Sequence, residues 1–289
     1  MLLHAAYRAL VLRQWVWAPA ISVPIAVSGV WYGLGAFALG RHAKRRGLGN
    51  WQVVAFYFGW ATLVLALMSP LHPLGEQLFS AHMIQHTLLM TVAAPLLVLG
   101  RPLNVGVWAL PLAWRRPMAR VVAPQWIRRC WSVITRPAVA WVVQGVVLWL
   151  WHAPKLYSLV LRSESIHAIQ HLSFLAAALI FWWSVLPMHA TRTRIGVSVM
   201  SLFTTAMHST VLGALIAVAP VPWYPTYVRT APEWGLSGLE DQQLAGLIMW
   251  IPAGVTYLIA TLVLVARVLR EPHWPAHPPA SSTLRVISP

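Results

Sequence analysis

The chain has 289 residues, of which 58% are hydrophobic and only 9% are charged. About a quarter of the residues in a soluble domain are charged, so this composition excludes an ordinary soluble protein and predicts an all-α polytopic membrane protein. The single cysteine, Cys130, excludes a disulfide framework and a metal site built from several cysteines within the chain.

Residues 1–18 are predicted to form an amphipathic helix at the membrane surface, with Tyr7, Trp15 and Trp17 as anchors among the lipid headgroups. Seven apolar runs follow, and most of them reach the length of about 20 residues that a helix needs to cross a bilayer. They lie at 19–39, 51–71, 79–99, 138–151, 166–186, 195–219 and 242–268. The fourth run is the shortest, and we expect one of its ends to lie in the interface.

Two further segments complete the chain. Residues 101–137 mix tryptophans with arginines, a composition that suits one or two helices lying along the membrane surface. Residues 272–289 are rich in Pro and Ser and are predicted to form a disordered cytoplasmic tail. The expected organisation is a single seven-helix transmembrane domain over residues 1–271, followed by this tail.

Basic residues mark one side of the predicted bundle. Sixteen of the 21 Lys and Arg residues fall after the first, third, fifth and seventh runs, among them the cluster RHAKRRG at 41–47. Five of the six acidic residues fall on the other side. Because Lys and Arg accumulate on the cytoplasmic side, we predict an outer N-terminus and a cytoplasmic C-terminus in the bacterial inner membrane. This placement attributes the net charge of +15 to membrane topology and to contact with the lipid bilayer. We therefore predict no nucleic-acid partner.

Two of the apolar runs open on one pattern, SAHMIQH in the third and SIHAIQH in the fifth. Each pattern holds two histidines four residues apart, which share one face of a helix. The predicted topology brings seven histidines to the outer side of the membrane: His72 in the second loop, and six in or at the ends of spans, His82, His86, His152, His167, His171 and His208. Ionisable groups inside a bilayer are costly, so such a gathering indicates a functional site.

Met90 lies four residues beyond His86 and continues the histidine stripe of the third run. Imidazole and thioether together suit copper, and Cu(I) in particular, whereas harder cations need carboxylates that these runs lack. We therefore predict a copper site made of the six histidines and Met90, with Gln85 and Gln170 orienting the rings. Zinc and haem are less favoured occupants.

Asp241 and the remaining histidines each have a structural interpretation as well as a functional one. Glu240 and Asp241 open the last run, where acidic residues also cap helices, so for Asp241 a metal or proton role and a capping role both stay open. The remaining histidines are interpreted as ordinary hydrogen-bonded residues: His4, His42, His72, His189, His273 and His277.

Three segments together resemble the CtaG-type family of bacterial membrane proteins, which are cytochrome c oxidase assembly factors. They are FSAHMIQHTLLMTVAAPLLVLGRPL, WHAPKLYSLVLRSESIHAIQHLSFLAAALIFWW and DQQLAGLIMWIPAG. The resemblance implies a multi-span, non-enzymatic protein that helps to mature a haem–copper oxidase, with oxidase subunits as partners and a role in copper delivery. By motif, it implies functional roles for His82, His86, His152, His167, His171 and Asp241.

Two alternatives remain open at this point. One is a seven-span zinc hydrolase, in which three histidines hold the metal, although no H-E-x-x-H motif is present. The other is a haem-binding electron carrier, in which His86 and His171 approach a haem from two helices. A retinal protein is disfavoured because both lysines, Lys44 and Lys155, lie in predicted loops.

Overall fold

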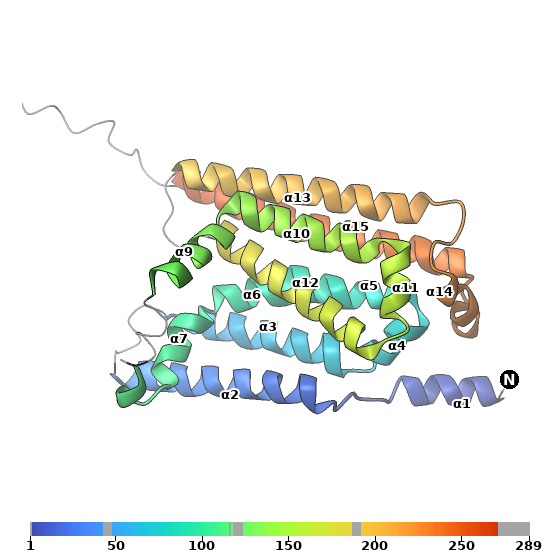
Figure 1. Ribbon diagram of the computed structural model, residues 1–289, viewed down its shortest axis with the longest axis horizontal. Coiled ribbons are helices and arrows are strands. Elements are labelled where there is room, and N and C mark those ends of the chain that lie inside the picture. The colour runs from blue at the N-terminus through green and yellow to red at the C-terminus, as the bar shows by residue number, and fades with distance from the viewer. Residues whose placement is uncertain (1, 43–47, 116, 118–123, 187–191, 271–289) are drawn as a thin grey trace, which may run out of the picture.

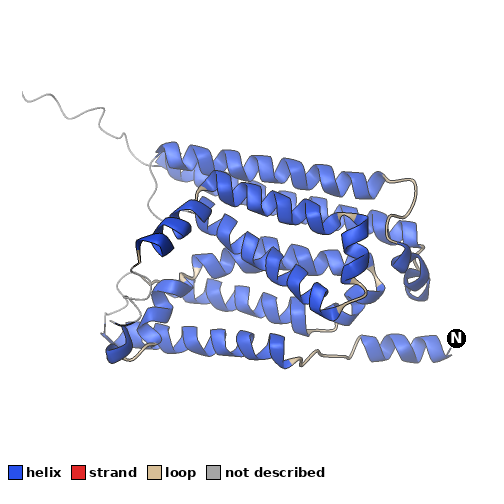
Figure 2. Ribbon diagram, viewed as in Figure 1, coloured by secondary structure: helices blue, strands red, loops and turns tan. Residues whose placement is uncertain are grey.

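A computed structural model describes residues 2–42, 48–115, 117, 124–186 and 192–270. Within these ranges every regular element is a helix and none is a strand (Figure 2), which confirms the expected all-α class. Six helices are long and apolar enough to cross a membrane. They are α2 (Pro19–His42), α3 (Asn50–Met68), the continuous helix α5–η1–α6 (Phe79–Leu99), α12 (Glu164–Val185), α13 (Arg192–Val218) and α15 (Gly238–Arg270).

The predicted fourth span corresponds to α10 (Pro137–His152), which has 16 residues. That length falls short of the roughly 20 residues needed to cross a bilayer. α9 (Gln125–Ile134) precedes it at an angle of 67°, and the bent pair counts as a seventh span only when the two helices are taken together. The structure therefore supports six or seven spans, while the orientation of the termini stays a prediction.

Short helices close the two ends of the bundle (Figure 1). α4 (Leu71–Gln77), α11 (Pro154–Val160) and α14 (Pro225–Thr230) lie at one end, and α7 (Pro102–Ala109) lies with α9 at the other. α1 (Leu2–Val11) and α7 and α9 fall in the segments expected at the membrane surface, but their depth in a membrane stays a prediction. The predicted tail, 272–289, lies outside the described residues.

The third span changes its helical pitch directly after the segment that carries its two histidines. Pro95 has no N–H to donate, and the preceding turns form the π-helix η1 (Leu88–Ala93), in which the Ala94 N–H donates to the Leu89 carbonyl. The carbonyl of Met90 is thereby released from the helix and accepts a hydrogen bond of 2.8 Å from Trp182 Nε1 on α12. This bond fixes the helices of the two histidine pairs against each other.

α13 and α15 pack closely because two glycines face each other where the helices cross. A Cβ atom added to Gly246 would lie 2.5 Å from the Gly213 carbonyl oxygen and 2.7 Å from the Ala217 nitrogen. Close backbone approach through small residues is a common way for membrane helices to associate. Gly254, further along α15, has no such neighbour within 4 Å among the described residues.

We expect Gly246→Ala to lower the stability of the detergent-solubilised protein by about 1–3 kcal/mol, because the methyl group forces the two helices apart. Thermal unfolding followed by circular dichroism measures the change. Gly254→Ala is the matched control on the same helix, and its midpoint should equal or slightly exceed that of the wild type. Equal midpoints for both variants would contradict the close packing of α13 on α15.

Candidate metal centre

Six histidines from four helices meet near the end of the bundle that α4, α11 and α14 close. They are His72 on α4, His82 and His86 on α5 (Phe79–Thr87), His152 at the end of α10, and His167 and His171 on α12. Neighbouring rings are in contact: the centroids of His82 and His167 are 5.0 Å apart, and those of His86 and His171 are 5.2 Å apart. Helices far apart in the sequence thus present one continuous cluster of imidazoles.

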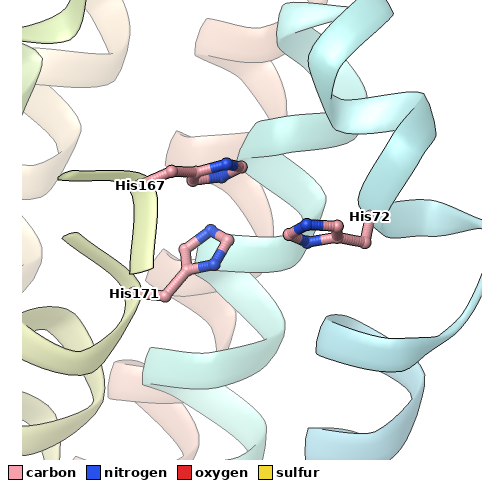
Figure 3. Close-up of side chains that lie close together, drawn as sticks. All are labelled: His72, His167 and His171. Atoms are coloured by element: carbon pink, nitrogen blue, oxygen red, sulfur yellow. The ribbon is translucent and has the colours of Figure 1, made fainter. Parts of the chain in front are cut away.

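Two sets of three ring nitrogens within this cluster are close enough to share an ion. The inner group consists of His82, His86 and His171, and the outer group of His72, His167 and His171 (Figure 3). In each group, one nitrogen per residue lies within 4.8 Å of the other two. His171 belongs to both groups. The inner group is buried throughout, whereas His72 is only partly buried.

The orientation of His82 is set by a neighbouring amide. Gln170 Oε1 lies 3.2 Å from His82 Nε2, and because a carboxamide oxygen only accepts, we assign the ring proton to Nε2. The opposite nitrogen, Nδ1, then carries no proton, so its lone pair is available to a metal ion. This nitrogen faces the protein interior. It is buried and has no hydrogen-bond partner among the described residues. A metal-ligating histidine is commonly held in this way by its second nitrogen.

His152 and Met83 form a softer pair of donors next to the inner group. His152 Nδ1 lies 2.7 Å from the Leu148 carbonyl oxygen, so this nitrogen carries the proton. The lone pair of His152 Nε2 then faces the thioether of Met83, with 3.4 Å between nitrogen and sulfur. Neither atom brings a proton to this contact. A small cavity next to this pair is lined by His86, His152, Met90 and Met249, among other residues.

Several buried polar atoms of the cluster lack a hydrogen-bond partner within the described part of the chain. They are His82 Nδ1, both nitrogens of His86, His167 Nε2, His171 Nε2 and Gln170 Nε2. Leaving such a group unpaired costs about 1–3 kcal/mol, so the arrangement is expensive unless something binds there. Nitrogen and thioether donors in a buried pocket fit Cu(I), and three imidazoles also fit zinc.

Asp241 on α15 belongs to neither histidine group and contacts the first turn of α5. Its carboxylate accepts hydrogen bonds from the N–H groups of Phe79 (2.7 Å) and Ser80 (3.0 Å) and from the Ser80 hydroxyl (2.5 Å). Asp241 is fully buried, and the bonds complement the unpaired N–H groups and the positive end of the helix that carries His82 and His86. In the structure it caps α5 from a distant part of the chain.

Three tyrosines position the short helices around the cluster. Tyr227 donates to the Gly75 carbonyl of α4 at 2.9 Å, and Tyr157 lies 2.9 Å from the Tyr227 oxygen, to which it donates. Tyr224 donates to the His152 carbonyl at 2.8 Å. Burial raises the pKa of all three hydroxyls, which therefore stay protonated and act as donors.

The structure brings five of the six predicted histidines together and sets one apart. His208 lines a lateral groove with Trp141 and Gly145 instead, and neither of its nitrogens has a partner among the described residues. Met90 lies beside His86, as its spacing predicts. His72 joins the cluster although the sequence predicts an ordinary hydrogen-bonded residue, because no helical spacing links it to the two pairs. Its place on the predicted outer side is the only signal in the sequence.

The sequence profile of the cytochrome c oxidase caa3 assembly factor family matches residues 30–271. The chain is 27% identical over 257 residues to uncharacterized proteins of Mycobacterium bovis and Mycobacterium tuberculosis, and 24% identical over 264 residues to one of Mycobacterium leprae. These alignments cover 84–86% of this chain but only 38–39% of the relatives, so the chain spans less than two fifths of their length. No solved structure matches the chain.

We expect Asp241→Asn to lower the stability of the protein by about 1.5–3 kcal/mol, because hydrogen bonds to a charged group are lost at the start of α5. Thermal unfolding in detergent measures this loss. Glu240→Gln is the matched control, since Glu240 is exposed and pairs only locally with Ser237. An Asp241→Asn variant that unfolds like the wild type but no longer binds metal would show a ligand rather than a cap.

Proposed function

The chain belongs to the cytochrome c oxidase caa3 assembly factor family, and we propose that it binds copper in its buried histidine cluster and passes the ion to an oxidase subunit. The family match, which confirms the resemblance drawn from the motifs, spans all six clustered histidines. This is a family of assembly factors and not of enzymes. Copper is accordingly cargo in the proposal, and no reaction of a bound substrate is required.

The inner group is the observation that carries the proposal. Its three rings belong to two helices, all are buried, and four of their six nitrogens are buried without a partner among the described residues. Neutral imidazoles with thioethers close by form a soft donor set, which favours Cu(I) over cations that prefer oxygen. Met83 and Met90 supply the thioethers next to His152 and His86.

Adjacent rings give the ion a way to move without entering water. The centroids of His82 and His86 are 4.3 Å apart, and His86 is 5.2 Å from His171. An ion held by two or three imidazoles can exchange one ring for the next while the others keep it bound. Because a protonated imidazole cannot ligate a metal, uptake of a proton promotes release.

Delivery takes place at the outer side of the bacterial inner membrane in this proposal. The apolar helices support a multi-pass membrane protein, and the cluster lies at the end opposite to α7 and α9 with their basic surroundings. The Lys and Arg distribution assigns that basic end to the cytoplasm. An oxidase subunit in the same bilayer then receives the ion laterally.

Two alternatives have less support from the geometry. A zinc hydrolase needs a general base beside the metal, but the inner group, which carries the proposal, includes no carboxylate, and the oxygens of Asp241 already bind the start of α5. A haem between His86 and His171 needs room for a porphyrin. Their rings are in edge-to-face contact, with an interplanar angle of 84°, and leave no such space.

Anaerobic loading of the purified protein with Cu(I), followed by metal analysis and an optical spectrum, tests the proposal. We expect bound copper, no Soret band and no stoichiometric zinc. His82→Ala and His171→Ala should each weaken copper binding tenfold or more, since even changes next to a metal ligand cost about 10–100-fold. His208→Ala is the matched control within a span and should bind like the wild type, because His208 lies outside both groups.

In cells, the same two alanine variants should lower the amount of assembled oxidase while the protein still inserts in the membrane. The haem and copper content of purified oxidase, normalised to the membrane level of the variant, gives the measurement. Variants that bind no copper yet mature the oxidase as well as the wild type would contradict the proposed role.

A further inference from the structure

His72 connects the buried cluster with the end of the bundle. It lies on α4, outside the six long helices, and is the least buried of the three residues in the outer group. Its ring stacks on that of His167 with 5.1 Å between centroids and an interplanar angle of 12°. His167 in turn stacks on His82 of the inner group at 5.0 Å and 19°. Three nearly parallel imidazoles thus lead inward from His72.

The inner group has no comparably exposed member. His82, His86 and His171 are each at most 6% exposed, so an ion reaching them from the outer solution must pass other side chains. The outer group shares His171 with the inner group and includes His72 at its solvent side. His171 is therefore the one ligand that an ion can keep while it exchanges the others.

Two carboxylates lie near the outer group. Glu76 lies on α4, four residues after His72, and Glu164 opens α12, three residues before His167. In a chain with a net charge of +15, this is a local negative region that attracts cations.

Two contacts fix His72 in place. Gln85 Nε2 donates to the Ala66 carbonyl of α3 at 2.7 Å and lies 3.3 Å from His72 Nδ1. Gly75 lets α4 approach α5, because a Cβ atom there would lie 2.5 Å from Gln85 Oε1. Gln85 therefore donates to His72 on α4, whereas Gln170 accepts from His82 on α5, and each amide fixes the orientation of one ring. His72 is therefore a ring of fixed position at the solvent side of the cluster, next to His167 and His171.

We propose that His72, His167 and His171 form a second metal site, at which Cu(I) is first captured and from which it passes to the inner group through His171. The inference rests on the proposed function, since it takes copper as the cargo. It adds a direction to that function: the ion moves from a nitrogen site near the solvent and two carboxylates to a buried site beside thioethers.

Transfer of Cu(I) from its coloured bicinchoninate complex to the full chain, in detergent and under anaerobic conditions, tests this order. The loss of absorbance gives both the rate of uptake and the affinity at equilibrium. We expect His72→Ala to slow uptake about tenfold or more while the affinity, held by the inner group, changes little. His82→Ala should instead weaken the affinity, and the control His208→Ala should alter neither quantity.

His72→Gln serves as a second variant should the alanine variant unfold α4, and thermal unfolding checks both. Uptake by a folded His72 variant as fast as by the wild type would overturn the outer site while leaving copper binding itself intact. An equal loss of rate and affinity would also overturn it, because His72 would then belong to one undivided centre. A wild-type chain that takes no copper would remove the proposed function and this inference together.

Discussion

The burial of unpaired imidazole nitrogens is the constraint on which the rest of this structure depends. Four of the clustered histidines place at least one nitrogen in the interior without a partner among the described residues. Such groups are expensive in an apolar bundle, so they must be held by their surroundings until a ligand arrives. The Asp241 cap on α5, the bond from Trp182 to Met90 and the three tyrosines each tie down an element that carries a histidine.

The two S-x-H-x-I-Q-H repeats acquire a physical meaning in this arrangement. In each repeat the histidines are proposed ligands and the glutamine orients a histidine of another helix. Gln170 bonds to His82, and Gln85 contacts His72. The second repeat therefore orients His82 of the first repeat, and the first repeat in turn orients His72 on α4. A buried polar network of this kind is demanding, because loss of one member leaves its partners unpaired.

Much of this was predictable from the sequence, and the remainder was not for identifiable reasons. Apolar run length predicts the long helices, and the spacing of His82 and His86 predicts a shared helix face. Lys and Arg counts predict which end a residue occupies but not its position around the bundle, so His208 was grouped with residues that it does not approach. His72 precedes a proline in a short connecting segment, where no periodic pattern shows which way the side chain points. The sequence alone leaves both roles of Asp241 open, and only the tertiary contacts show that it caps a helix 162 positions away.

An X-ray absorption spectrum at the copper edge of the Cu(I)-loaded full chain tests the central claim most directly, because it reports the atoms bound to the ion. The account predicts scattering from two or three imidazole rings, and fewer rings in His171→Ala, since that residue belongs to both groups. Copper with no imidazole scattering, or a spectrum that is the same in wild type and His171→Ala, would contradict it.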